Sequence, residues 1–188
     1  MSLGDAGLSE RNGDRRVQRS RAALKAAFVE LVLQRGYDAV GPADVAVQAN
    51  VGRSTFYEHF KGMDDLLRFS INHHLLILAG SSLKPDLDKD LLRVVEHFWE
   101  HRRFAKAMFA GNAGMVVHRR LFEHLEIGIS ALPQAKAEHA QVKAKLLAIQ
   151  IAASQIALLE AWLAGRASTS SAVIAQTIHR GSYALVSS

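Results

Sequence analysis

Apolar residues recur along most of the chain at the three- and four-residue spacing of amphipathic helices, and we find no segment with the convincing alternation of a strand. The first such segment runs from about Arg15 to Arg35, and Gly36 favours its end. Its apolar face is formed by Leu24, Phe28, Leu31 and Val32. The pattern therefore predicts an all-α fold.

Two short helices joined by a tight turn are predicted over Gly41–Phe60. Pro42 suits the first position of the first helix, and Asn50 tolerates the left-handed backbone of a sharp turn. In the second helix Phe56 and Phe60 are four residues apart and point inward. The residues expected to face outward are Arg53, Ser54, Thr55, Tyr57, His59 and Lys61. Such a helix suits a DNA major groove, and the alternative is a plain helical hairpin with a polar surface.

Five further helices are predicted after this hairpin. They run from Asp64 to Leu78, from Asp86 to about Ala110, from Met115 to about Leu132, from about Lys136 to Gly165, and from Thr169 or Ser170 to about Val186. The helices become longer and more apolar after Pro85, and we place the domain boundary inside the fourth helix. We expect a disordered basic leader (1–14), a helix-turn-helix domain (15–70) and a second helical domain (71–188), with about nine helices in all.

Composition narrows the class of protein. The chain has 188 residues, of which 49% are hydrophobic and 22% charged, as expected of a globular protein. It has no cysteine, which excludes disulfides, thiolate metal sites and cysteine nucleophiles. No apolar run approaches the roughly 20 residues that span a bilayer, and the N-terminus lacks the apolar core of a secretory signal. We expect a soluble cytoplasmic protein with no membrane partner.

The positive charge is concentrated just ahead of the two short helices. The formal net charge is +5, and the segment from Arg11 to Lys25 carries six basic residues against one acidic residue, Asp14. Within it, Arg15, Arg16 and Arg19 are candidates for contacts with DNA phosphates. The alternative is a charged leader that is simply solvated.

Residues 36–67 resemble the DNA-binding domain of TetR/AcrR transcriptional regulators. The matching positions are Gly36-Tyr37, Asp44-Val45-Ala46, Ala49-Asn50-Val51 and Thr55-Phe56-Tyr57-Glu58-His59-Phe60-Lys61. The resemblance implies that Arg53, Ser54 and Thr55 read bases, whereas Tyr57 and Lys61 hold phosphates. Several positions depart from the family pattern: Gly52 replaces the usual Ser, Asn50 replaces Gly, Met63 replaces Lys, and Val40 and Gly41 lack hydroxyls.

The resemblance further implies a non-enzymatic bacterial regulator without a cofactor, a homodimer that binds a pseudo-palindromic operator in double-stranded DNA. By the same resemblance it is a repressor, released by a small apolar effector in the second domain. The pocket candidates are Phe98, Trp99, Phe104, Met108, Phe122, Gln150, Ser154 and Trp162. Each of the large side chains could equally be plain core. A helix-turn-helix protein that binds no ligand is the alternative.

The helix from 136 to 165 is apolar on more than one face, so it needs a second partner, and a four-helix dimer interface would provide one. The residues assigned to that interface are Ile156, Leu159, Leu163, Ile174 and Ile178. A fully buried helix in a monomer is the alternative.

One motif points to different chemistry. His97-Phe98-Trp99-Glu100-His101 matches the His-x-x-Glu-His pattern of a class of zinc peptidases, with the two histidines four residues apart. No recognisable downstream carboxylate completes a catalytic site, so no metal ligands are assigned. A metal-dependent hydrolase that uses His97 and His101, or a regulatory metal on the same pair, stays open as an alternative.

Overall fold

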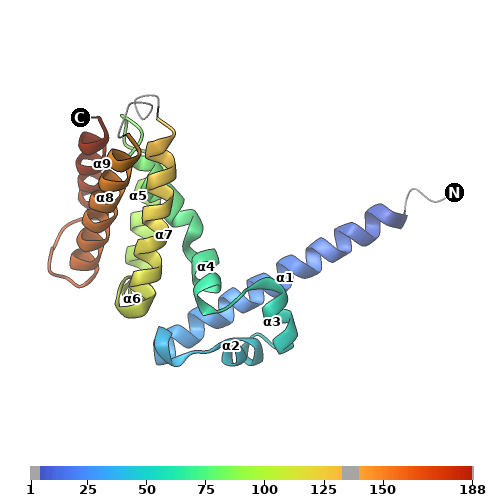
Figure 1. Ribbon diagram of the computed structural model, residues 1–188. Coiled ribbons are helices and arrows are strands. Elements are labelled where there is room, and N and C mark those ends of the chain that lie inside the picture. The colour runs from blue at the N-terminus through green and yellow to red at the C-terminus, as the bar shows by residue number, and fades with distance from the viewer. Residues whose placement is uncertain (1–4, 133–139, 188) are drawn as a thin grey trace. The chain divides into compact units, whose positions relative to one another are not determined.

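The computed structural model describes residues 5–132 and 140–187, with side chains described for 15–132 and 141–187. These residues form nine α-helices and one short 3-10 helix, without a strand (Figure 1). The helices are α1 (Asp5–Arg35), η1 (Tyr37–Ala39), α2 (Pro42–Gln48), α3 (Arg53–His59), α4 (Met63–Ser81), α5 (Lys89–Glu100), α6 (Arg102–Phe109), α7 (Gly111–Ser130), α8 (Ala140–Leu163) and α9 (Ser171–Ser187). The predicted all-α fold is confirmed.

The chain divides into two compact units. Unit 1 is Met1–Leu66 and unit 2 is Leu67–Ser188, so the division falls inside α4, which is continuous from Met63 to Ser81. The sequence predicted a division in the same helix, four residues later. The helix expected to end at Leu78 extends to Ser81.

Unit 1 is built on one face of α1. Its predicted core residues Leu24, Phe28, Leu31 and Val32 are all at most 3% exposed, and both α2 and α3 contact this helix. Tyr37 packs edge-to-face against Phe28, with ring centroids 6.2 Å apart. The Tyr37 hydroxyl donates a hydrogen bond of 2.6 Å to Asp64 Oδ1 at the start of α4.

The expected disordered leader over residues 1–14 is not what the structure describes. Helix α1 begins at Asp5, and residues 1–4 lie outside the described residues. No proline interrupts residues 5–35, and Arg, Ala, Leu and Glu are favourable helix formers. The helix therefore continues N-terminally beyond the apolar periodicity on which the prediction relied.

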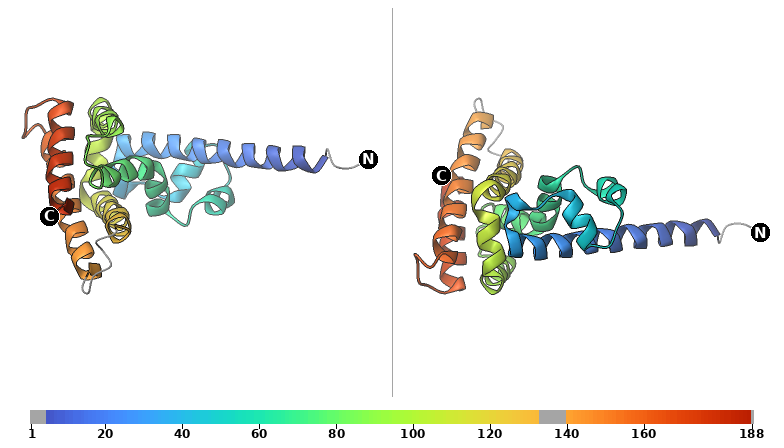
Figure 2. Two further views of the ribbon diagram at one scale, coloured as in Figure 1. Left: turned by 90° about the horizontal axis from the view of Figure 1, so that it is seen from above. Right: turned by 90° about the horizontal axis from the view of Figure 1, so that it is seen from below.

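Unit 2 is a bundle of helices centred on α8. This helix contacts α6, α7 and α9, and α9 in turn contacts α5, as the two views of Figure 2 illustrate. Its core includes Leu91, Leu121, Leu125, Ile151 and Trp162, each at most 1% exposed. Among the described residues, only the segment Gln141–Leu163 is long and apolar enough to cross a membrane, and 44% of its most apolar window is buried. Length and composition alone do not distinguish such a span from a core helix.

The single helix predicted from Asp86 to about Ala110 is wrong, because the chain bends at His101 (φ −105°, ψ 32°) between α5 and α6. The bend brings Phe98 and Phe109 into edge-to-face contact, with centroids 5.3 Å apart. On a straight helix, residues eleven apart would be separated by about 16 Å. The apolar spacing stays in phase across the bend, so the sequence pattern does not reveal it.

The break predicted at Gly111–Gly114 is shorter than expected. Helix α7 already begins at Gly111, whose φ of 57° makes the turn. Gly114 lies inside the helix, where an added Cβ would come within 2.3 Å of the Phe109 carbonyl oxygen. The predicted end of α8 at Gly165 (φ 81°) is confirmed by the hydrogen bond of 2.8 Å from Arg166 N to Ala161 O.

Candidate nucleic-acid interface

The turn between α2 and α3 is fixed by local backbone geometry. Pro42 occupies the first position of α2, and the carboxylate of Asp44 accepts a 2.9 Å hydrogen bond from Gly41 N, which caps the helix. Asn50 has φ 52°, the only positive φ among non-glycine residues in the described part of the chain. Val51 N then donates to Ala46 O at 3.0 Å and closes the turn. The predicted role of Asn50 is confirmed.

Helix α3 has the predicted buried apolar face. Phe56 and Phe60 are 0% and 3% exposed, with ring centroids 5.9 Å apart. Burying two phenylalanine side chains contributes roughly 3–6 kcal/mol to holding the helix in place. These two side chains therefore determine which face of α3 packs against the rest of unit 1.

The opposite face of α3 carries exposed polar groups. Arg53, Ser54, Tyr57 and Lys61 are exposed, and Thr55 is half-buried. The guanidinium carbon of Arg53 lies 5.8 Å from the centre of the Tyr57 ring, a cation–π arrangement. The ring of Tyr57 thus limits the directions in which Arg53 extends, while both side chains stay accessible.

His59 does not face outward as predicted. It is half-buried, and its Nε2 lies 2.6 Å from Ser20 Oγ on α1. The Ser20 hydroxyl is also 3.0 Å from the carbonyl oxygens of Arg16 and Val17; when it donates to one of them, its oxygen accepts from His59 in the tautomer that carries the hydrogen on Nε2. Position 59 is three residues from Phe56, which turns it toward the buried side of α3. His59 therefore anchors α3 to α1.

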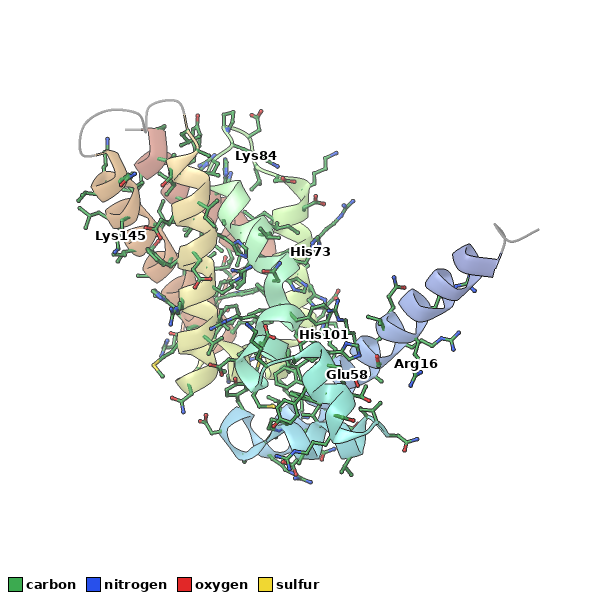
Figure 3. The ribbon with its side chains drawn as sticks, turned by 45° about the vertical axis from the view of Figure 1, so that its right-hand side comes forward. Arg16, Glu58, His73, Lys84, His101 and Lys145 are labelled. Carbon is green, nitrogen blue, oxygen red and sulfur yellow. The ribbon has the colours of Figure 1, made fainter. Side chains whose placement is uncertain are left out.

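A groove of about 770 Å³ runs between α1 and the turn before α3. It is lined by Arg16, Val17, Arg19, Ser20, Ala23, Asn50, Val51, Gly52, Thr55, Glu58 and His59. Arg15, Arg16 and Arg19 are all exposed, and they belong to a helix rather than to a disordered arm. Figure 3 labels Arg16 on α1 and Glu58 on α3.

Sequence reasoning missed two contributors to this surface. Ser20 gave no signal, since a lone serine inside a helix is usually solvated. Glu58 belongs to the matching motif of α3, yet it is exposed and brings a negative charge into a groove that also contains Arg16 and Arg19. A carboxylate there opposes phosphate approach on that side of α3.

The predicted pocket residues of unit 2 fall into three groups. Phe98, Met108 and Trp162 are buried in the core, and Trp162 Nε1 donates to Thr169 O at 3.0 Å. Trp99 is 39% exposed and stacks on Trp162 with centroids 4.7 Å apart, whereas Phe104 and Phe122 are half-buried. Gln150 and Ser154 are exposed. The buried polar residue of α8 is Gln155, at 1% exposure.

The five residues assigned to a dimer interface lie in the core of the single chain, which corrects the assignment. Ile156, Leu159, Leu163, Ile174 and Ile178 are at most 7% exposed, so they have no surface left for a partner. The exposed apolar residues of α8 and α9 lie on another side: Val142, Leu146, Ile149 and Val173 are 45–61% exposed.

Comparison with known proteins connects this geometry to a family. Residues 24–68 match the family model described as bacterial regulatory proteins, tetR family. An uncharacterised HTH-type transcriptional regulator of Bacillus subtilis, YxbF, is 35% identical over 63 residues, which are 33% of this chain and 17% of that protein. The similarity in sequence thus spans about one sixth of that relative.

Solved structures extend the likeness in fold to nearly the whole chain. A TetR-family regulator from Streptomyces coelicolor superposes with a TM-score of 0.62 at 18% identity, over 91% of this chain and 96% of that one. A TetR regulator from Streptococcus agalactiae gives 0.57 at 20% identity, over 92% and 98%. The helix-turn-helix region of this chain therefore matches the TetR family in sequence, and nearly the whole chain shares the fold of TetR-family transcriptional regulators.

Proposed function

We propose that the protein is a transcriptional repressor that binds double-stranded DNA as a homodimer and is released by a small molecule in unit 2. The observation that carries the DNA-binding part is the two-sided character of α3. Its back, Phe56 and Phe60, is buried, and its front, Arg53, Ser54 and Tyr57, is exposed. A short helix held by one face and polar on the other is suited to entering a major groove.

Each exposed group has a distinct role in this proposal. The forked guanidinium of Arg53 reads a guanine edge, and Ser54 and Thr55 contact base edges near the start of the helix. The phenol of Tyr57 and the ammonium of Lys61 donate to phosphates, which fixes the register of α3 on the duplex. Because His59 holds α3 against α1, we no longer assign it to DNA.

The basic residues of α1 supply a second set of phosphate contacts. Arg15, Arg16 and Arg19 are exposed on a continuous helix, so they are presented to the backbone with little loss of backbone entropy. Each neutralised phosphate releases counterions and contributes to the salt dependence of binding.

The homodimer is proposed to form through the exposed face of α8 and α9. On α8 this face carries Val142, Leu146 and Ile149 at 45–61% exposure, continued by the exposed Ala153 and Ala157. On α9 it carries Val173, Thr177, Gly181 and Ala184, all exposed and on one helical stripe. Small residues let helices approach closely, and the alternative is to leave this apolar face in water. A two-fold dimer requires a pseudo-palindromic operator with half-sites about one helical turn or more apart.

The effector site is proposed among α4, α8 and α9, next to the amide of Gln155. That amide is buried, and its Nε2 lies 3.0 Å from Ser82 Oγ and 2.9 Å from Ser182 Oγ, while its Oε1 has no hydrogen-bond partner. Reversing the amide would leave the nitrogen in that position instead. A buried polar atom without a partner is uncommon and is suited to a ligand with one polar group on an apolar body. For release, the effector must bind the two DNA-binding geometries unequally, and α4 is the continuous helix that joins the units.

The test compares the wild-type protein with the variant Y57F/K61A on a random duplex and on a selected operator. Losing one phosphate contact from Lys61 in each subunit should reduce the slope of log affinity against log salt by about 2, since each phosphate contributes about 0.9. Loss of the Tyr57 hydrogen bonds should weaken binding further by about 1 kcal/mol per subunit. The matched control is R93A, an exposed arginine on α5 in unit 2. Unchanged affinity and slope in Y57F/K61A would remove α3 from the DNA interface.

A regulator that binds no ligand remains the second candidate. In that case no small molecule would change operator affinity, and replacement of Gln155 by leucine would leave DNA binding unchanged. In the proposed case, an effector that releases DNA from the wild type should release it less readily from Q155L. We expect the protein to act in the cytoplasm, where its DNA is.

A further inference from the structure

Three side chains with metal-binding groups meet where α5 ends. His97 lies in the last turn of α5, Glu100 is its final residue, and His101 is the residue at which the chain bends into α6. We call these three residues the α5–α6 cluster; Figure 3 labels its His101. Spacings of three and four residues place such groups on the same face of a helix. The proposed DNA-binding and effector functions use none of them.

The three groups lie close enough to share one ion. One ligand atom from each of the three residues lies within 4.8 Å of the other two, and the imidazole centroids of His97 and His101 are 4.3 Å apart. Ligand atoms of a tetrahedral zinc ion are roughly 3.4 Å apart, given bonds of about 2.0–2.2 Å. Glu100 is exposed and can close the remaining distance by side-chain rotation.

The structure also orients His101 as a metal ligand. Its Nδ1 lies 3.1 Å from the carbonyl oxygen of His97. A carbonyl oxygen only accepts, so in the neutral ring Nδ1 carries the hydrogen and Nε2 keeps its lone pair. An imidazole that donates one N–H to a backbone carbonyl and offers the other nitrogen to a cation is the usual arrangement in metal sites, because the hydrogen bond fixes the tautomer and the ring orientation.

A third imidazole, that of His74, orients His97. The ring of His74, on α4, stacks on that of His97 with centroids 4.9 Å apart and planes inclined by 7°. Stacked rings direct their in-plane lone pairs in parallel, so the two do not converge on one ion. His74 therefore serves to hold the plane of His97, and the cluster supplies three ligands, with the remaining coordination positions open to water.

We propose that the α5–α6 cluster binds one divalent transition-metal ion, of which Zn²⁺ is the best match. Two imidazoles and one carboxylate suit zinc and its neighbours in the first row, whereas Ca²⁺ and Mg²⁺ prefer sites made entirely of oxygen. The ion binds Nε2 of His101, a ring nitrogen of His97 and a carboxylate oxygen of Glu100.

Binding of this ion joins the last turn of α5 to the bend. The guanidinium of Arg102, the next residue, lies 4.6 Å over the ring of Trp99, and Trp99 stacks on Trp162 of α8. The ion therefore stabilises the bend next to Trp99 and Trp162, whose fluorescence should change when the ion binds. In His-x-x-Glu-His peptidases the glutamate is the general base, not a ligand. Here the Glu100 carboxylate lies with the two histidines as a third ligand, so the geometry favours metal binding over hydrolysis.

The experiment titrates ZnCl₂ into the full-length protein without a polyhistidine tag, by calorimetry and by tryptophan fluorescence. We expect one ion per chain, at least about 100-fold weaker binding in H97A/H101A, and about tenfold weaker binding in E100Q, in line with the usual effect of removing ligands and their supporting groups. The control H118A removes a histidine elsewhere in unit 2, on α7, and should bind like the wild type.

Thermal unfolding without metal, followed by circular dichroism, verifies that each variant is folded. A second readout is Co²⁺, whose visible absorption bands should appear with the wild type and the control but not with H97A/H101A. Equal Zn²⁺ affinity in H97A/H101A and the wild type, or the absence of saturable 1:1 binding, would overturn the proposal.

Discussion

The contact between His59 and Ser20 gives the sharpest prediction about how α3 is held against α1. Removing the imidazole in H59A, or the hydroxyl in S20A, breaks the 2.6 Å hydrogen bond that joins α3 to α1. A partly buried hydrogen bond of this kind contributes about 1 kcal/mol. The S20A variant also gains up to about 0.5 kcal/mol of helix propensity, so the single variants differ and only their coupling isolates the contact.

Hydrogen exchange followed by mass spectrometry measures this coupling where it acts. Both tryptophans, Trp99 and Trp162, lie in unit 2, so their fluorescence does not report on α3. A loss of about 1 kcal/mol should accelerate exchange of amides in residues 53–60 about fivefold, while exchange in residues 151–163 of α8 stays unchanged. The double variant S20A/H59A should exchange little faster than H59A, because the second change removes a contact that is already lost.

DNA binding distinguishes an anchoring role of His59 from the DNA contact that the sequence predicted for it. If His59 anchors α3, H59A weakens affinity but leaves the salt dependence unchanged, since no phosphate contact is lost. An H59A protein with a lower salt slope and unaltered exchange in residues 53–60 would refute the anchoring role and restore His59 to the DNA surface.

Three further predictions concern unit 2. L146E should convert the proposed dimer into monomers in analytical ultracentrifugation, whereas I127E, on the similarly exposed Ile127 of α7, should dimerise like the wild type; a dimeric L146E would exclude the proposed face. G114A should lower the free energy of unfolding in urea by about 1–3 kcal/mol, because its Cβ would meet a backbone carbonyl at 2.3 Å. G80A, whose Cβ meets open space, should raise that free energy by about 0.5–1 kcal/mol, and equal stability of the two variants would contradict the packing. Burial, and secondly the neighbouring Arg120, lower the pKa of His124 in the folded chain. The unfolded chain therefore takes up the proton more readily, and the free energy of unfolding should fall as the pH drops below about 6.5. H124Q should reduce this loss of stability, and an identical pH profile in H124Q and the wild type would contradict the role of His124.

The helix-turn-helix region was predictable because several independent local signals agree there. Phe56 and Phe60 set the buried side of α3, Pro42 the start of α2, and Asn50 the turn. Each of these depends on neighbours in sequence, which a single chain reveals. The residues on the opposite face of α3 were therefore predicted to be exposed. His59 was the exception, because it lies at the edge of the apolar stripe and the pattern does not determine whether it faces solvent or α1.

Unit 2 was harder to predict because its decisive contacts join distant residues. Helix α8 is apolar nearly all round, so periodicity does not tell which of Leu146 and Ile156 faces the core; in the structure it is Ile156. The bend at His101 lies at neither a proline nor a glycine, and it is accompanied by the contact between Phe98 and Phe109, which are eleven residues apart. Similarly, the buried amide of Gln155 donates to two serines far away in the sequence, Ser82 in the turn after α4 and Ser182 on α9.

The central claim is that α3 from two subunits reads two half-sites in double-stranded DNA. Repeated selection from a pool of genomic fragments with the purified wild-type protein, followed by sequencing, tests this most directly. The account predicts enrichment of one pseudo-palindrome with half-sites about one helical turn or more apart, and loss of that enrichment in Y57F/K61A. Failure to enrich any sequence, or enrichment of a single asymmetric site that Y57F/K61A selects equally well, would contradict it.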